Sequence, residues 1–251
     1  MKIIISGCNG MLGQTISKVI EEKSDIEVIA GLSRSPKKIN NSYPVYTSIF
    51  ECEEEVDVII DCSNPQCLPD LLKYAVERSI PILIATTGLS KENIEDIKIA
   101  SKKIPVLYTA NTSLGLNLLI NLVKKSVLVL EENFDIEIIE KHHNKKMDAP
   151  SGSAYMIADA INQELDNSKK YIFGRSGNEE KRTKNEIGIH AIRGGTICGE
   201  HNVIFAGLDE IIEIKHTALS KKVFASGAVK AAEYIVHKDS GLYNMEDLID
   251  L

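Results

Sequence analysis

Short apolar segments rich in isoleucine, leucine and valine recur through the first 113 residues and alternate with amphipathic stretches. The apolar segments span residues 2–6, 26–32, 56–62, 80–87 and 104–110. Their nearly continuous apolarity is typical of strands that are buried on both faces of a parallel sheet. The stretches 14–23, 68–78 and 91–103 have the spacing of amphipathic helices. This alternation predicts an α/β domain with a doubly wound parallel sheet.

The pattern changes after Asn111. A long apolar-rich helix is expected at 114–130, an alternating strand at 134–141, and a helix that begins near Gly152. Residues 166–186 are charged and rich in Gly and Asn, which predicts a mobile surface loop. The chain therefore continues into a second, α+β domain that carries a mixed sheet and is followed by a helix at 224–237. Three further strands of that sheet are expected at 187–193, 202–206 and 210–217.

Length and composition narrow the class of protein. The 251 residues are enough for one large domain or two modest ones. A net charge of −7 argues against nucleic-acid binding, which needs a basic excess. No apolar run reaches the roughly 18 residues of a membrane span, and the apolar N-terminus is too short for a signal peptide. The five cysteines are irregularly spaced, which predicts reduced thiols and a cytoplasmic protein.

A glycine-rich segment, Gly7-Cys8-Asn9-Gly10-Met11-Leu12-Gly13, follows the first predicted strand and opens the first helix. Glycines let the backbone turn tightly and approach a pyrophosphate, which then binds N–H groups at the positive end of the helix dipole. The spacing is Gly-x-x-Gly-x-x-Gly, a variant of the dinucleotide-binding pattern, and the strand and helix around it supply the context. A Rossmann-type domain is therefore predicted. A tight turn without a ligand is the alternative.

The end of the second predicted strand bears on the choice of nucleotide. NAD-binding domains place an acidic residue there, which accepts the ribose 2′-hydroxyl. This chain has Ser33 and Arg34 instead, followed by Lys37 and Lys38. Because a guanidinium suits a 2′-phosphate, we expect NADPH, with NADH as the alternative. Lys37 and Lys38 are more simply explained as a solvated basic loop.

Residues 140–154 carry most of the candidate chemistry. His142, His143 and Lys146 come at the end of a predicted strand. A histidine that titrates near neutrality can move a proton, although adjacent histidines are also common on surfaces, and Asp148 can simply form a turn. No metal site is expected, because adjacent strand residues point to opposite faces and no third ligand is near.

A helix start follows at once. Pro150 and Ser151 have the pattern of a helix N-terminus, with Ser151 as the N-cap. The N–H groups of Gly152 and Ser153 would then lie at the positive end of the helix dipole. Together with the nearby cations, this arrangement suits a small dicarboxylate substrate.

These features together resemble the 4-hydroxy-tetrahydrodipicolinate reductase (dihydrodipicolinate reductase) family over essentially the whole chain. Ser153 stands where that family usually has Thr, Cys62 where Phe is common, and Lys221 where Arg is frequent. The chain is also somewhat short for the family. Further matches lie at 85–88, 110–115, 193–201 and 224–228. The most specific match is His142-His143-x-x-Lys146-x-Asp148-Ala149-Pro150-Ser151-Gly152-Ser153.

The resemblance implies an oxidoreductase of lysine and diaminopimelate biosynthesis. It would reduce 4-hydroxy-tetrahydrodipicolinate (dihydrodipicolinate) to tetrahydrodipicolinate with NADPH or NADH. It implies that His142 is the general acid/base and Lys146 a proton donor. The substrate carboxylates would be bound by His143, Gly152 and Ser153. The nucleotide would contact Gly7, Cys8, Asn9, Gly10, Met11, Leu12, Ser33, Arg34, Thr86, Thr87, Gly88, Ala110, Asn111, Thr112 and Ser113.

The resemblance also implies an organisation in three segments. Residues 1–113 would form the dinucleotide-binding domain, and 114–222 the domain for substrate binding and oligomerisation. Residues 223–251 would return to the first domain. The family forms homotetramers through its second domain, so a homotetramer is expected.

Three other functions stay open at this point. Tyr234 and Lys238 fit the Tyr-x-x-x-Lys pattern of short-chain dehydrogenases, although they lie near the C-terminus on a predicted amphipathic helix. A nucleotide-sensing protein would keep the fold without turnover. Another NAD(P)-dependent dehydrogenase would act on a different small anionic substrate.

Overall fold

The computed structural model describes residues 1–36, 39–178 and 180–249. By their contacts they form two compact units. The first unit comprises Met1–Leu114 and the chain from Lys221 onward, and the second comprises Gly115–Ser220. Among the described residues, none of the helices is long and apolar enough to cross a membrane.

In the described part of the first unit, seven parallel strands form one sheet in the order β12-β6-β5-β4-β1-β2-β3. The direction in which strands are added reverses between β1 and β4, and open α/β sheets bind ligands beyond the carboxyl ends of their strands at such a point. This arrangement confirms the doubly wound parallel sheet. The strands are β1 (Lys2–Ser6), β2 (Glu27–Leu32), β3 (Val45–Tyr46), β4 (Val58–Asp61), β5 (Ile82–Ile84), β6 (Pro105–Tyr108) and β12 (Gly241–Tyr243).

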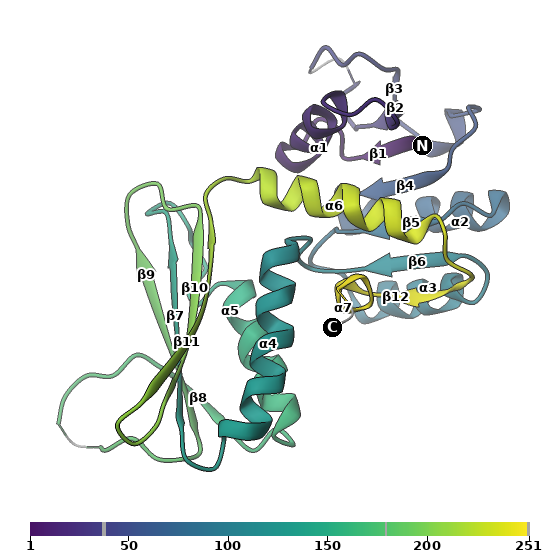
Figure 1. The fold of residues 1–251 in the computed structure, drawn as a ribbon. Helices are drawn as coiled ribbons and strands as arrows, with labels where there is room; N and C mark the ends of the chain where they lie inside the picture. The colour runs from purple at the N-terminus through teal and green to yellow at the C-terminus, as the bar shows by residue number, and fades with distance from the viewer. Residues whose placement is uncertain (37–38, 179, 250–251) are drawn as a thin grey trace. The chain divides into compact units, whose positions relative to one another are not determined.

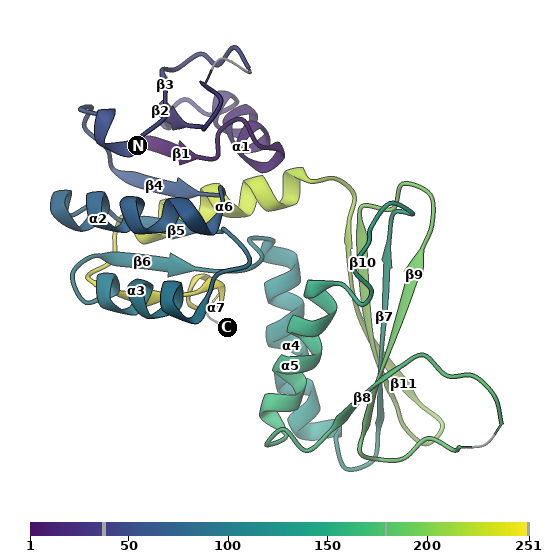
Figure 2. The ribbon, with the colours of Figure 1, turned by 180° about the vertical axis from the view of Figure 1, so that it is seen from behind.

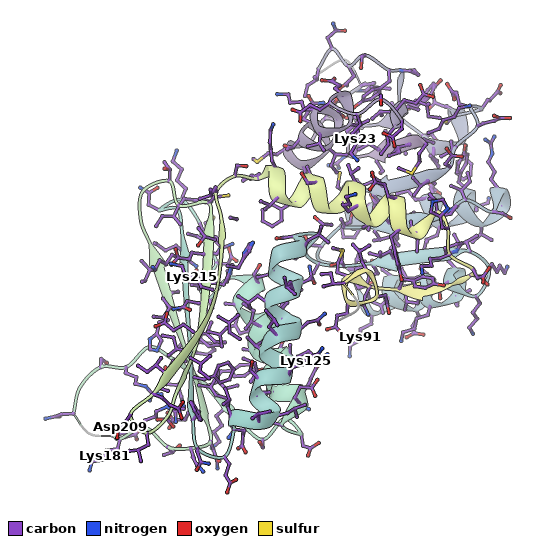
Figure 3. All side chains as sticks on the ribbon, viewed as in Figure 1. Lys23, Lys91, Lys125, Lys181, Asp209 and Lys215 are labelled. Atoms are coloured by element: carbon purple, nitrogen blue, oxygen red, sulfur yellow. The ribbon has the colours of Figure 1, made fainter. Side chains whose placement is uncertain are left out.

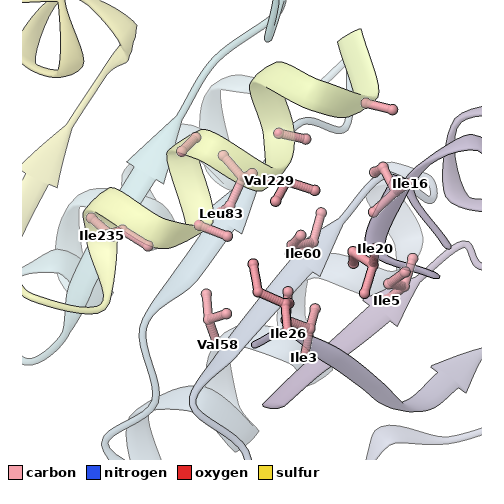
Figure 4. Packing of buried hydrophobic residues seen from close by; sticks show 14 of the residues in the cluster. Ile3, Ile5, Ile16, Ile20, Ile26, Val58, Ile60, Leu83, Val229 and Ile235 are labelled. Carbon is pink, nitrogen blue, oxygen red and sulfur yellow. The ribbon is translucent and has the colours of Figure 1, made fainter. Parts of the chain in front are cut away.

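Helices cover both faces of this sheet (Figure 1, Figure 2). Ile3 and Ile5 of β1 belong to the core under α1 (Met11–Glu21) and α6 (Lys222–Ile235), as Figure 4 shows. Ile4 belongs to the opposite core, under α2 (Leu68–Arg78) and α3 (Lys91–Ser101). Each fully buried isoleucine contributes about 1.5–3 kcal/mol. Burial on both faces explains why these strands are apolar throughout.

Helix α6 is bound tightly to the first unit, although it follows the second unit in the chain. Lys23, which lies just after α1 and is labelled in Figure 3, donates a 2.6 Å hydrogen bond to Glu233 of α6. Gly227 lies against the loop after β6, where a Cβ on this residue would come within 1.7 Å of the Thr112 carbonyl oxygen. Thr112 also donates a 2.7 Å hydrogen bond from its hydroxyl to the Phe224 carbonyl. The start of α6 is therefore fixed beside that loop.

The described part of the second unit holds a mixed five-stranded sheet in the order β11-β10-β7-β9-β8. Strand β10 is antiparallel to β7 and β11, whereas β9 is parallel to β7 and β8. Helices α4 (Leu114–Leu130) and α5 (Gly152–Glu164) pack on one face, over Ile138 and Phe205 (Figure 1). The expected α+β domain with a mixed sheet is confirmed. Its strands are β7 (Asp135–His142), β8 (Lys170–Phe173), β9 (Glu186–Arg193), β10 (Gly199–Ala206) and β11 (Ile211–Ala218).

The prediction of a mobile loop over 166–186 was wrong in part. Strand β8 lies inside this range and pairs with β9. The Arg182 side chain donates hydrogen bonds to Asp135 and Glu137, and Arg175 bonds Glu137 and Glu186. Charged residues here therefore form ion pairs with carboxylates on β7 and β9. The composition of this segment does not distinguish charged residues in ion pairs from charged residues in a solvated loop.

Several short elements were not predicted from the sequence. They are too short to show a period, because a strand of two or three residues or one turn of helix gives no repeat. Besides β3 and β12, they are α7 (Met245–Leu248) and the 3₁₀ helices Ile49–Glu51 and Pro65–Cys67.

Candidate active site

The glycine segment forms the tight turn between β1 and α1. Gly7 has φ +84°, and a Cβ there would lie 2.6 Å from the carbonyl oxygen of Cys62, which follows β4. A Cβ on Gly13 would lie 2.4 Å from the Gly7 carbonyl oxygen. Gly10 is the N-cap of α1, whose fully described first turn contains no acidic residue. The turn thus leaves a positive helix end at the reversal point of the sheet, as anion binding requires.

Two of the cavities in the described part of the first unit share Cys62 and Ser63 in their walls. The larger, of about 510 Å³, contains predicted contacts from the glycine turn and the end of β2: Gly7, Asn9, Gly10, Ser33 and Arg34. The smaller, of about 310 Å³, contains Leu12, Thr86, Thr87, Ala110, Asn111 and Thr112, together with Phe224 of α6.

Four of the predicted nucleotide contacts do not line these cavities. Cys8 has its side chain in the core, where burial raises the pKa of the thiol to about 11. Ser113 is buried, and Met11 is exposed. Gly88 has φ +76° and open space where a Cβ would be. Of these, Cys8 and Ser113 have enclosed side chains that are poorly placed for direct nucleotide contact.

Asn9 connects the glycine turn to the loop after β2. Its amide nitrogen donates hydrogen bonds of 3.2 Å to the Ser33 hydroxyl and 2.8 Å to the Ser35 carbonyl. Asn41 donates a 2.9 Å bond to the Asn9 side-chain oxygen. Arg34 is therefore carried on a loop that is anchored at the cavity. Lys37 and Lys38, expected to be solvated, lie outside the described residues.

A buried carboxyl group, which the sequence reasoning missed, supports the wall shared by both cavities. Asp61 ends β4 and is fully buried. It accepts hydrogen bonds of 2.7 Å from the Thr86 hydroxyl and 2.5 Å from the Ser63 hydroxyl. Burial raises the pKa of Asp61, although these hydrogen bonds oppose the rise. The ends of β4 and β5 are joined in this way.

In the second unit, His142 is held by a buried carboxylate. Its Nδ1 lies 2.7 Å from Oε2 of Glu140, which is fully buried. Arg193, the register partner of His142 on β9, donates two 2.7 Å hydrogen bonds to the two Glu140 oxygens. Burial alone would raise the pKa of Glu140, but bonds from Arg193, His142 and the Ser151 N–H lower it. Glu140 is therefore ionised at neutral pH.

His142 itself is only partly enclosed. Burial lowers its pKa, and the Glu140 carboxylate opposes this by favouring the imidazolium. The positive charges of Lys146 and Arg193 add to the lowering. A neutral imidazole whose Nδ1 faces an ionised carboxylate has its proton on Nδ1 and a lone pair on Nε2. His142 is thus ready to exchange a proton at Nε2.

A second histidine, not predicted, lies against His142. The ring of His201 is buried and meets His142 edge to face, with 5.3 Å between centroids. Its Nε2 lies 3.3 Å from the Ser151 hydroxyl, which also accepts a 3.2 Å bond from the Ala154 N–H and so caps α5. Burial lowers the pKa of His201 to about 4, so the ring is neutral at physiological pH. The N-cap predicted at Ser151 is present.

The remaining predicted substrate residues lie around this cap. The Lys146 ammonium lies 2.8 Å from the Asp148 carboxylate. Asp148 therefore forms an ion pair with Lys146 and does more than shape a turn. Gly152 is exposed and starts α5, whose fully described first turn has no acidic residue. Ser153 follows it, half-buried. His143 is half-buried, and within the described chain its Nδ1 has no hydrogen-bond partner.

A metal site and the Tyr-x-x-x-Lys alternative can both be compared with the geometry of the described residues. In the described ranges, no group of three or more His, Cys, Asp and Glu side chains is arranged to hold a metal ion. The Lys238 ammonium lies 4.3 Å from the centroid of the Tyr234 ring, and that ring packs edge-on against Tyr243. Tyr234, on α6, and Lys238, just past the end of that helix, therefore form a packing pair, which accounts for the Tyr-x-x-x-Lys pattern without catalysis.

Family models match almost the whole chain. Residues 1–112 match the model described as "Dihydrodipicolinate reductase, N-terminus" and residues 115–249 the model described as "Dihydrodipicolinate reductase, C-terminus". The chain belongs to the dihydrodipicolinate reductase family. The predicted family is thus confirmed, and its members are NAD(P)-dependent oxidoreductases.

Curated members of the dihydrodipicolinate reductase family are similar over their full length. The 4-hydroxy-tetrahydrodipicolinate reductase of Caldanaerobacter subterraneus subsp. tengcongensis is 52% identical over 249 residues, covering 99% of this chain and 98% of that protein. The protein of the same name from Clostridium novyi is 48% identical, covering 99% and 98%. Both alignments include the glycine turn and the histidine segment.

Solved structures agree on the fold. The dipicolinate-bound dihydrodipicolinate reductase from Paenisporosarcina sp. TG-14 superposes with a TM-score of 0.84, at 22% identity, covering 100% of this chain and 99% of that one. A probable dehydrogenase from Thermotoga maritima gives 0.64 at 11% identity, covering 99% and 92%. The dihydrodipicolinate reductase fold therefore accounts for the architecture of both units.

Proposed function

We propose that this protein reduces dihydrodipicolinate to tetrahydrodipicolinate with a nicotinamide nucleotide, in lysine and diaminopimelate biosynthesis. The observation that carries the proposal is the His142–Glu140 pair beside Lys146 and the capped start of α5. Membership of the dihydrodipicolinate reductase family supports this particular reaction for a site with that geometry. A proton-exchanging group next to an anion-binding helix end suits a reaction that adds a proton to a dicarboxylate.

The nucleotide is assigned to the first unit, where Gly7, Gly10 and Asn9 line the larger cavity at the glycine turn. The reduced nicotinamide, when bound, supplies the hydride. Arg34, on the anchored loop after β2, is assigned to a 2′-phosphate, so NADPH is the preferred nucleotide. The absence of a carboxylate from Ser33 and Arg34, where an acidic residue would bind the ribose 2′-hydroxyl, supports this assignment.

The second unit is assigned the substrate and the proton. The N–H groups at Gly152 and Ser153 bind one carboxylate at the positive end of α5, with His143 nearby. Lys146 supplies positive charge where negative charge accumulates on the substrate ring, which stabilises the transition state. In its imidazolium form His142 delivers the Nε2 proton to the substrate and returns to the neutral Nδ1–H ring, and Lys146 serves as a second donor. Hydride and proton addition together complete the reduction.

The test is an assay in which the cyclic product of pyruvate and aspartate semialdehyde is supplied and the oxidation of NADPH and NADH is followed separately. Substrate-dependent oxidation is expected. His142→Gln should lower kcat with little change in KM, whereas Lys146→Ala should change both. Exposed residues of the same types provide the controls, so His237→Gln, in the first unit, and Lys145→Ala, next to Lys146, should keep wild-type kinetics. Nucleotide binding without oxidation would favour the sensing protein instead.

The wider expectations are proposals of the same kind. They are a dinucleotide-binding domain over 1–113, a substrate and oligomerisation domain over 114–222, and a C-terminal segment 223–251 that returns to the first domain. A cytoplasmic homotetramer is proposed with them. Sedimentation equilibrium tests the assembly, since a tetramer of 27.7 kDa chains is readily separated from a dimer or monomer.

A further inference from the structure

Glu140 has a set of partners that the proposed reaction does not by itself require. Both carboxylate oxygens are used twice. Oε1 accepts bonds of 2.7 Å from Arg193 and 2.9 Å from the Ser151 N–H, and Oε2 accepts 2.7 Å bonds from Arg193 and His142. A carboxylate accepts about four hydrogen bonds. The acceptor capacity of Glu140 is therefore filled by groups from three separate parts of the second unit.

One of these bonds controls the form of the His142 ring. An ionised carboxylate can only accept, so the proton of the neutral ring lies on Nδ1 and the lone pair on Nε2. The space beside Nε2 is provided by Gly199, where a Cβ would lie 3.2 Å from that nitrogen. Nε2 is thus the reactive atom, and a glycine prevents crowding around it.

Another bond extends to the anion-binding end of α5. The Ser151 N–H donates to Glu140, while the Ser151 hydroxyl caps the helix and approaches His201. The same carboxylate therefore orients the proton-exchanging ring and the helix start that is assigned to a substrate carboxylate. Arg193 neutralises its charge, which a fully buried carboxylate requires.

We propose that Glu140, held by Arg193, is a positioning residue that fixes the Nδ1–H form of His142 and joins it to the start of α5. This inference rests on the proposed function. Glu140 is fully buried with both oxygens bonded to protein groups, so it acts through His142 and Ser151. It is the counterpart of the third residue that orients a catalytic histidine in other enzymes.

The proposal gives a definite pH effect. The charged and titratable groups around His142 are Glu140 on its own strand, Arg193 on β9, His201 on β10 and Lys146 in the following loop. Only Glu140 favours the imidazolium among them. Replacing its charge by a neutral amide leaves burial and two cations, all of which disfavour the imidazolium. The pKa of His142 must then fall further.

The experiment compares Glu140→Gln with Glu137→Gln. Glu137 is a matched control, because it lies on the same strand, accepts a 2.7 Å bond from His190, and pairs with Arg175 and Arg182. Glu140→Gln should lower kcat about 10- to 100-fold with a smaller change in KM. Its kcat should also decline with rising pH at a lower pH than in the wild type. Glu137→Gln should show neither effect.

Nitrogen-15 NMR of the histidine rings gives a readout that needs no substrate. The wild type should show His142 protonated on Nδ1, and Glu140→Gln should shift this ring toward the Nε2–H form and lower its titration midpoint. Glu140→Asp keeps the charge for Arg193 but shortens the side chain. If Glu140→Gln does not fold, Glu140→Asp should show the same shift to a smaller degree.

The outcomes separate the two proposals. An unchanged tautomer and titration of His142 in Glu140→Gln, with wild-type kcat, would overturn the positioning role while leaving the reductase activity intact. Failure of the wild-type protein to oxidise either nucleotide with substrate would reject the proposed function. The NMR result would then still report on Glu140 and His142.

Discussion

The buried ring of His201 predicts how the stability of the protein depends on pH. Burial lowers its pKa from 6.5 to about 4, and the neighbouring His142 adds to the lowering. The unfolded chain therefore binds a proton between these pH values that the folded protein does not. Stability contributed by neutral His201 is fully present above pH 6.5, is lost as the pH falls toward 4, and falls no further below 4.

The size of the effect follows from the difference in proton affinity. Each tenfold change corresponds to about 1.4 kcal/mol. A His201 pKa of 6.5 in the unfolded chain and about 4 in the folded protein therefore corresponds to about 3 kcal/mol of unfolding free energy. That is a large fraction of the roughly 5–15 kcal/mol by which proteins are stable.

The assay is urea unfolding of the wild type and of His201→Gln at several pH values between about 7 and about 4. The variant cannot bind this proton in either state, so its free energy of unfolding should fall by about 3 kcal/mol less than that of the wild type. His237→Gln is the control, because His237 is exposed. Parallel curves for the wild type and His201→Gln would show that the fold does not hold the His201 ring neutral.

Three further substitutions test other parts of the structure. Arg34→Ala should raise the Kd of NADPH about tenfold or more and change the Kd of NADH little, since a charge-assisted hydrogen bond is worth about 1.5–3 kcal/mol. Fluorescence titration measures both constants. Equal losses of affinity for the two nucleotides would remove the reason to prefer NADPH. Gly199→Ala should lower kcat by up to about tenfold with little loss of stability, because the added Cβ would lie 3.2 Å from His142 Nε2. A wild-type kcat in this variant would show that Nε2 is not the reactive atom. Gly227→Ala should destabilise the protein by about 3 kcal/mol in urea unfolding, because the added Cβ would meet the Thr112 carbonyl at 1.7 Å. Unchanged stability would show that α6 moves freely away from the loop after β6.

Much of the fold can be predicted from the sequence, because most helices and strands are long enough to show a regular spacing of apolar residues. Helices α2 and α4 begin and end where the pattern predicts. The buried strands of the first unit are apolar throughout, since both faces pack against helices. Strand β8 was missed because it is a short edge strand among charged residues, and only its pairing with β9 defines it.

The candidate site was only partly predictable for a related reason. His142 and Lys146 stand out as chemistry-bearing residues close together in the chain. Glu140 lies two residues before His142 and shares its face of the strand, a spacing that could have indicated the pair. Arg193 is 53 positions from Glu140, and only the register of β7 with β9 brings them together. His201 is likewise placed by β10.

Hydride transfer from a nicotinamide to a cyclic dicarboxylate is the step on which the assigned roles of both units depend. The most direct measurement supplies NADPH carrying deuterium at the transferring position, together with the condensation product of pyruvate and aspartate semialdehyde, and analyses the product by mass spectrometry. We predict tetrahydrodipicolinate with one deuterium bound to carbon. Product without deuterium, or oxidation of the nucleotide with no reduced product, would contradict the account.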